Sequence, residues 1–391
     1  MTQVICALRR LSVVFLSLFF IHCSTSIPSK AVEYFESCQE DAGIELLKGK
    51  EVKDKDILLF DLALLSFAVH SDETRLGIRH GSRALSNMWT LGDEKRGKIS
   101  MASSEAARDY KGEPFEKTMA GIYLGAIFFN IGDYQNARAA FQKAVLASET
   151  KSDKTKNEKV PLAHFLLAKT FDILGQEDNA KISLEKAQKY SDVMQSLRPK
   201  DLSSIHTIVV VETGQAPRKV RTGPGNSLIT YQHDYSPFLG ANLYNNGNLI
   251  GGTKVVEDLY VHAKENERGK KEALQGTKGA IRDASTVVAV GAADNDNGGV
   301  ALVAGILALA NQSQADTRQW SLLPARLHIT WDASKLYEGK NDYKLQFLTN
   351  SRRIDPLVQQ NWTDERTASE PKIYIKKARH CYQQTKEREI I

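Results

Sequence analysis

Two stretches of this sequence repeat one pattern of small and bulky residues at helical spacing, and this repetition restricts the possible folds most. The equivalent glycines, Gly132 and Gly175, are 43 residues apart. The pattern is typical of tetratricopeptide-like helix pairs, whose unit of about 34 residues would here carry a polar insertion at 151–159. The pattern is formed by Gly125, Phe128, Gly132, Tyr134, Ala137, Phe141 and Ala144 in the first unit, and by Ala168, Phe171, Gly175, Ala180, Leu184 and Ala187 in the second.

Small residues in such a pattern let neighbouring helices approach closely, while the bulky residues fill the space between them. An earlier hairpin, 57–69 followed by 74–85, lacks the turn and aromatic positions, so we interpret it as a degenerate repeat. A stack of at least three hairpins is expected, because one unit cannot bury its own apolar face. Such a stack has a concave groove, with Tyr123 and Phe165 as candidate groove residues. The alternative is that the chain fills this groove itself.

Beyond residue 203 the pattern changes to that of strands. Residues 205–212 resemble a buried strand, 326–331 and 343–347 alternate between apolar and polar, and a short strand is expected at 373–375. Within 326–331 the apolar side chains share one face and the polar ones the other, which predicts a sheet with one solvated face. We expect the boundary between the two halves at 197–204, where a proline interrupts a polar cluster.

These patterns predict an α+β fold, in which helical hairpins precede an antiparallel β domain that carries an Ala/Gly-rich helical hairpin. The predicted hairpin, 286–310, has an apolar arm of only eleven residues at 300–310, whereas a span needs about 20. Burial is therefore favoured over membrane insertion. The expected divisions are a signal peptide at 1–22, an anchor or linker at 23–53, a helical repeat domain at 54–200, and a C-terminal α+β domain with a β-sandwich-like sheet at 203–391.

The first residues predict secretion across the inner membrane. Arg9 and Arg10 precede an apolar run at 11–21, which is too short to span a bilayer and is typical of a secretory signal. Removal of these two arginines lowers the formal net charge from +5 to +3. A charge this small does not indicate a nucleic-acid partner. The sequence gives no sign of the oligomeric state.

The cysteines suggest two modifications. Cys23 follows the signal and is the candidate for lipidation, which would hold the protein to a membrane surface. His22 is an unusual residue before a lipidated cysteine, and the alternative is ordinary cleavage near Ser26. Cys38 and Cys381 are a possible disulfide in an oxidising compartment, and the alternative is two unpaired thiols.

The sequence offers no pattern that predicts catalysis. Its nine histidines are scattered, without the spacing of a metalloprotease, a serine hydrolase or a Cys-x-x-Cys site. His206 and His328 are expected on strands, where packing is a more common role than metal binding. A charged run at 264–282 is interpreted as a solvated helix face rather than a site for anionic head groups. We therefore predict no catalytic residue, no metal and no cofactor.

Two motifs in the second half carry a family resemblance. Residues 214–219 (GQAPRK) and 315–324 (ADTRQWSLLP) resemble a family of bacterial outer-membrane lipoproteins with tetratricopeptide-like repeats. The resemblance implies a periplasm-facing lipoprotein of the outer membrane, with no catalytic residues to transfer. Gly214 and Pro217 would turn the chain out of its strand, and Asp316 would pair with Arg318 so that Trp320 and Leu322 pack inward. The motif residues are Gly214, Pro217, Asp316, Arg318, Trp320 and Pro324.

Together these features predict a non-catalytic interaction protein, anchored in the cell envelope, that binds a protein or peptide partner through the groove of its helical repeats. Two other functions are possible. One is an envelope enzyme that acts on a cell-wall polymer, with residues that meet only in the fold. The other is a membrane-perturbing protein that uses the hairpin at 286–310.

Overall fold

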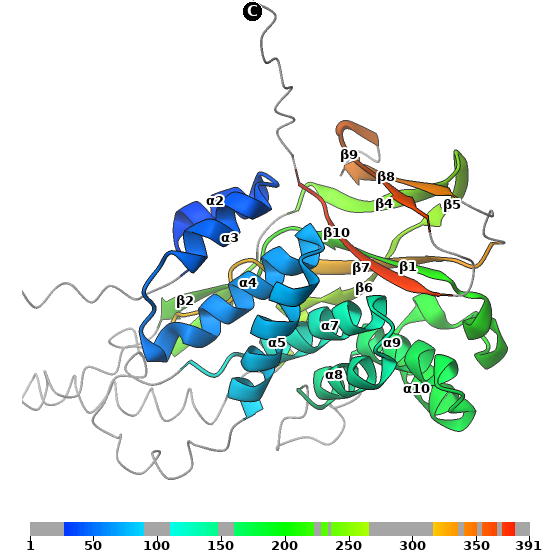
Figure 1. Cartoon of the computed structure of the whole chain (residues 1–391), viewed down its shortest axis with the longest axis horizontal. Helices are drawn as coiled ribbons and strands as arrows, with labels where there is room; N and C mark the ends of the chain where they lie inside the picture. The colour runs from blue at the N-terminus through cyan, green and yellow to red at the C-terminus, as the bar shows by residue number, and fades with distance from the viewer. Residues whose placement is uncertain are drawn as a thin grey trace, which may run out of the picture.

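The computed structural model describes residues 27–89, 110–147, 160–222, 228–233, 236–265, 316–334, 340–349, 354–365 and 370–379. Within these residues the chain has an α+β fold, with paired helices in the N-terminal half and mostly antiparallel sheets in the C-terminal half (Figure 1). The fold class predicted from the sequence is confirmed at this level. The predicted signal peptide, Cys23, Cys381 and the hairpin 286–310 lie outside the described residues.

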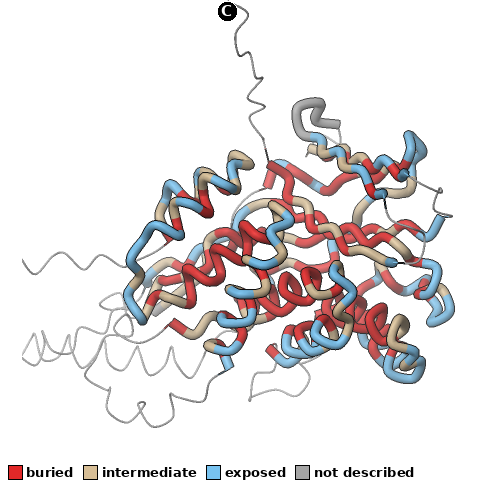
Figure 2. The backbone as a smooth tube through the Cα atoms, in the orientation of Figure 1, coloured by how far each residue is buried: buried red, intermediate tan, exposed pale blue. Residues whose placement is uncertain are grey.

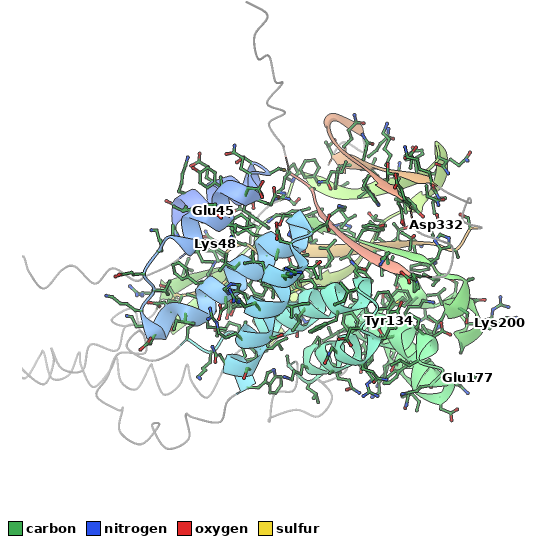
Figure 3. The ribbon with its side chains drawn as sticks, viewed as in Figure 1. Glu45, Lys48, Tyr134, Glu177, Lys200 and Asp332 are labelled. Atoms are coloured by element: carbon green, nitrogen blue, oxygen red, sulfur yellow. The ribbon has the colours of Figure 1, made fainter. Side chains whose placement is uncertain are left out.

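Helices succeed one another as antiparallel pairs joined by short turns. The α-helices of the first half are α2 (Ser29–Glu36), α3 (Glu40–Lys48), α4 (Ile57–Ser71), α5 (Thr74–Trp89), α7 (Pro114–Asn130), α8 (Tyr134–Ala147), α9 (Pro161–Ile173) and α10 (Glu177–Tyr190). Figure 3 marks Tyr134 and Glu177, which begin the second helices of two successive pairs. Short 3₁₀ helices, η2 (Asp54–Asp56), η5 (Asp192–Met194) and η6 (Pro199–Ser204), fill the connections.

The turns of α7–α8 and α9–α10 are built in the same way. Gly132 and Gly175 both have positive φ angles, +81° and +68°, which glycine adopts without steric cost. The next residue in each turn donates its backbone N–H to the carbonyl of Phe128 or Phe171, at 2.9 Å in both cases. Between α7 and α8, a Cβ added at Gly125 would lie 2.4 Å from the Phe141 ring. Close packing therefore requires a glycine at this position.

Three sheets follow the helices. The strands are β1 (Thr207–Thr213), β2 (Arg218–Thr222), β3 (Leu228–Gln232), β4 (Phe238–Asn245), β5 (Asn248–Gly252), β6 (Lys254–Asp258), β7 (Arg326–Asp332), β8 (Asn341–Thr349), β9 (Ile354–Asp364) and β10 (Lys372–Lys377), with helix α11 (Leu259–Glu265) after β6. The middle sheet has the order β10-β1-β7-β6, and the outer sheet has the order β5-β4-β8-β9. Strands β2 and β3 form a separate hairpin. Only the β1–β10 pair is parallel among these strands.

The elements form three layers, with the helix pairs on one face of the middle sheet and the outer sheet on its other face (Figure 1). Ile208 and Val210 of β1 belong to the core shared with the helices, whereas Val209 and Val211 belong to the core shared with the outer sheet. The helical half and the sheet half therefore share one core. The buried residues gather in the helix pairs and the middle sheet (Figure 2).

The expectation of a solvated face on β7 is wrong. His328 is 1% exposed and Thr330 is 7% exposed, although both lie on the polar face of the strand. Gly240 of the outer sheet lies over the His328 ring, where an added Cβ would be 3.4 Å from its Nδ1 atom, and Thr213 of the neighbouring strand β1 contacts the ring at 3.0 Å. Polar alternation indicates solvent only when no second layer covers the face and no neighbouring strand supplies hydrogen-bond partners.

The end of β10 is tied to the first helices. The buried Lys377 forms an ion pair with the half-buried Glu36 at 2.9 Å, and the buried Arg379 forms one with the half-buried Glu40 at 2.7 Å. Cys38, between these two glutamates, is disulfide-bonded, and its partner lies outside the described residues. Pairing with Cys381 stays a prediction. No helix in the described ranges is long and apolar enough to cross a membrane.

Candidate functional site

The inner face of the helix pairs is closed by the chain itself. Tyr123 and Phe165, the candidate groove residues, are both 0% exposed. The Tyr123 hydroxyl donates to Glu212 of β1, and the Phe165 ring lies 5.6 Å from the Trp331 ring of β7. The expectation that these two residues offer a surface to a partner is therefore wrong. The alternative, a groove filled by the chain, is what the structure shows.

Glu212 is the centre of the contact between helices and sheet. Its carboxylate is 0% exposed, lies 3.1 Å from the Nε2 atom of His70 and accepts the hydroxyl of Tyr123. Burial raises the pKa of this carboxyl, but His70 and Lys377 outweigh burial and leave the pKa below its usual value. Groups from α4, α7 and β10 thus meet one ionised side chain, which fixes the helices on the sheet.

A second polar cluster joins the same layers through the 315–324 motif. The Trp320 backbone N–H donates to Glu116 at 2.6 Å, and its indole N–H donates to Ser66 at 2.9 Å. Arg318 pairs with Asp316 at 2.8 Å, as the sequence predicts, and with Asp56 at 3.2 Å. Burial raises the pKa of Glu116, because the side chain is 0% exposed.

The 214–219 and 315–324 motifs contact each other. Gly214 has a φ of +70°, and a Cβ there would lie 2.9 Å from the Cβ of Ala325, immediately after Pro324. The Ala216 backbone N–H donates to the carbonyl of Leu323 at 2.8 Å, beside the buried Pro217. The motifs therefore form one packed corner, and their described residues line neither of the two cavities described below.

Four pairs of a histidine with an acid could suggest catalysis. In one of them His206 lies 3.7 Å from Asp332, at the end of β7, and its ring also contacts the Ser334 carbonyl. His70 with Glu212 is fully buried, and His80 with Asp61 lies 2.7 Å apart between α4 and α5. His262 and Glu257, 2.6 Å apart, line a cavity of about 10 Å³. A cavity of this size holds about one water molecule, so it leaves no room for a substrate.

Glu257 also has a structural role. Its other carboxylate oxygen accepts the Leu162 backbone N–H at 3.0 Å, in the first turn of α9. This contact satisfies one of the donors that a helix leaves free at its N-terminus. The two histidines expected on strands do not meet, since His206 precedes β1 and His328 lies opposite Val211 near the other end of that strand.

A second cavity lies between α4, α7 and the outer edge of β10. Its volume is about 70 Å³, several times the volume that one water requires. We call it the β10 edge cavity. It is lined by Ala68, Val69, Asp72, Thr74, Ala126, Ile127, Asn130, Ile373, Tyr374, Ile375 and Lys376.

Four consecutive residues of β10 line this cavity, which places the strand's backbone against it. Successive residues of a strand direct their N–H and C=O groups to opposite sides. Lys372 and Ala378 donate to the strand on the inner side, so the even-numbered residues face β1 and the odd-numbered residues face outward. The outer edge of β10 therefore presents the peptide groups of Ile373, Ile375 and Lys377.

Side-chain amides occupy two of these three positions. Asn130 donates to the Ile373 carbonyl and accepts the Ile373 N–H, both at 2.8 Å. Gln360 donates to the Lys377 carbonyl at 2.7 Å. Between them, the backbone N–H and C=O of Ile375 have no hydrogen-bond partner among the described residues. Ile375 is 5% exposed and lines the β10 edge cavity.

Sequence reasoning missed Asn130, Ile375 and Gln360. Asn130 and Ile373 are separated by 243 positions, and no local pattern indicates that a helix-end amide will pair with a strand edge. The expected strand at 373–375 was the one available signal, because a short final strand at the edge of a sheet has an unpaired side.

No cluster of three metal-ligating side chains occurs among the described residues. No family model matches the chain, and comparison with curated proteins and with solved structures gives no significant match.

Proposed function

We propose that this chain is a non-catalytic interaction protein of the bacterial envelope, held to the outer membrane by a lipid on Cys23, and that its protein partner binds at the β10 edge cavity. The location and the anchor rest on the signal-like residues 1–22 and on the resemblance of the 214–219 and 315–324 motifs to envelope lipoproteins. The partner site moves from the inner groove to the cavity, because the groove is filled.

The proposal includes tetratricopeptide-like repeats for α7–α8 and α9–α10. The support is the equal construction of their turns, with a positive-φ glycine and the same backbone hydrogen bond to Phe128 or Phe171. The small residues at the helix contacts are buried as that repeat requires, including Ala137 and Ala180 at 0% and 3% exposed. A filled groove converts these repeats from a binding surface into a support for the middle sheet.

The observation that carries the proposal is the composition of the β10 edge cavity. Its lining combines apolar side chains with strand backbone and the polar side chains of Thr74 and Asn130, and its charged residues are Asp72 and Lys376. Binding sites likewise combine apolar contact surface with convergent polar groups that fix the orientation of the ligand. The four histidine–acid pairs of the described residues lie outside this cavity.

Site-specific photo-crosslinking in cells that produce the protein tests this proposal. A benzoylphenylalanine at Thr74, in the wall of the cavity, is expected to give one recurrent crosslinked protein. The same residue at Ile182, which is 51% exposed on α10, is the control and should not give that product. Equal crosslinking from both positions, or none from Thr74, would contradict the proposed function.

A filling substitution sharpens this test. Ala126 is 3% exposed in the cavity wall, and Ala126→Leu should reduce the Thr74 crosslink at least fivefold by occupying the space. Ala139→Leu is the matched control, because Ala139 is exposed on α8. Thermal unfolding of both variants shows whether loss of the crosslink comes from loss of the fold.

A further inference from the structure

We infer that the β10 edge cavity binds one extended residue of a partner polypeptide, whose backbone exchanges two hydrogen bonds with Ile375. This inference rests on the proposed function and specifies the chemistry of its partner. The groups that carry it are the N–H and C=O of Ile375, which face outward from β10 and lack a partner among the described residues. A buried peptide group without a partner is destabilising, so a ligand that supplies both bonds is favoured.

The neighbouring position shows how such a bond pair is made. The Asn130 amide presents one donor and one acceptor to Ile373, in the same way that a residue of an antiparallel strand would. A backbone residue of a partner would repeat this arrangement at Ile375. Strand addition of this kind obtains affinity from main-chain bonds and selectivity from the adjoining side-chain pocket.

The two amides limit the addition to a single residue. Asn130 already occupies the outer side of Ile373, and Gln360 already bonds the carbonyl of Lys377. Both bonds of Ile375 can go to one residue only in an antiparallel pairing, because a parallel partner receives them on two different residues. The structure therefore favours an antiparallel partner that touches β10 at one residue and diverges on both sides.

The cavity also restricts the side chain of that residue. Directly opposed residues in a strand pair place their side chains on the same face, and Ile375 faces the helices. On the helix side, the β10 edge cavity is lined by Ala68 of α4 and Ala126 of α7, whose small side chains leave its volume of about 70 Å³. A small or β-branched apolar residue, such as alanine or valine, fits this space, and a charged one does not.

Nuclear magnetic resonance of the full processed chain tests the inference with a minimal ligand. The ligand is acetyl-valine methylamide, which presents one residue's N–H and C=O. In protein labelled with ¹⁵N-isoleucine, it is expected to shift the Ile375 amide resonance and slow its exchange with water. The Ile375→Val variant identifies this resonance by its disappearance. The same compound methylated on the valine nitrogen lacks the donor, and we expect it to bind roughly tenfold more weakly.

Two variants control for non-specific binding. Ala126→Leu should abolish the shift at Ile375, whereas the matched Ala139→Leu should preserve it. Asn130→Ala should free the Ile373 peptide group, so that acetyl-Val-Ala-Val methylamide, which the native chain cannot pair at two positions, binds more tightly than the one-residue ligand. Equal binding of the N-methylated compound would overturn the inference. So would an Ile375 amide resonance that does not shift when the ligand is added, because water alone would then occupy the cavity. If the Thr74 crosslink persists in that case, the partner site stands and only its strand-addition chemistry fails.

Discussion

Both faces of the middle sheet bury polar groups, but the hydrogen-bond and ion-pair partners of these groups differ between the two faces. On the helix-facing side, Glu212 is ionised against His70 and Lys377. On the side that faces the outer sheet, Asp332 accepts from the Asn245 amide at 3.0 Å and from the Tyr343 hydroxyl at 3.2 Å, while His328 bonds to Thr213 within the middle sheet. Ion pairs thus fix the helices, whereas uncharged donors fix the outer sheet. Glu212 and Thr213 are adjacent in β1, so the difference arises from the face of the sheet to which each side chain points.

The largest expected effect comes from removing the charge on the helix-facing side. Glu212→Ala leaves His70 buried without its carboxylate and removes one of the two carboxylates near Lys377, which keeps Glu36, so we expect the free energy of unfolding to fall by about 3–5 kcal/mol. Urea denaturation measures it. Glu45→Ala, which breaks an exposed pair with Lys48 (Figure 3), is the control and should change stability by less than about 1 kcal/mol. Similar values for the two variants would remove the contrast between the faces.

The next effect concerns how the end of β10 is held. Because Arg379 contacts Phe35 and Glu40, Cys381 follows a residue already placed beside Cys38, so we expect these two cysteines to form the disulfide. Cys38→Ser should lower the free energy of unfolding by about 2–4 kcal/mol under oxidising conditions. Addition of a reductant should lower the stability of the native chain by the same amount and leave the variant unchanged. Unreduced peptide mapping that joins Cys38 to Cys6 or Cys23 would contradict the pairing.

The uncharged side should respond to pH. Burial, with Arg326 nearby, lowers the pKa of His328 to about 4 from its usual 6.5. The unfolded chain therefore takes up this proton first as the pH falls, and stability decreases between about pH 6.5 and 4 by up to about 3 kcal/mol. Above pH 6.5 this contribution is fully present and constant. His328→Gln should remove this part of the pH dependence, and a parallel pH profile for the two proteins would exclude a neutral His328.

The smallest effect separates adjacent residues on the two faces. Thr213→Val keeps the side-chain shape but removes the bond to His328, so we expect a loss of about 1 kcal/mol. Its combination with His328→Gln should cost less than the sum of the two, since the two side chains share one contact. Differential scanning calorimetry can resolve this coupling. If Thr213→Val lowered the free energy of unfolding as much as Glu212→Ala does, the face of the sheet would not decide how much a polar side chain of β1 contributes to stability.

Much of the fold could be predicted from the sequence, because its helices and several strands have regular periodicity. Residues 57–69 and 205–212 follow the local rules for helix and strand, and the structure places α4 and β1 there. The sequence could not predict that the outer sheet covers the polar face of β7, since His328 and Thr330 have the alternation of a solvated face. The candidate site could not be predicted either, because it depends on Asn130 meeting a strand far along the chain.

The side-chain amides at the edge of β10 also affect how copies of this protein behave at high concentration. An unpaired strand edge can template stacking with another chain, and growth of such a stack requires several free peptide groups in succession. Asn130 and Gln360 interrupt that succession on both sides of Ile375. The edge of β10 can thus pair with one residue of a partner and still resist the fibril formation that an edge with several free peptide groups in succession would permit.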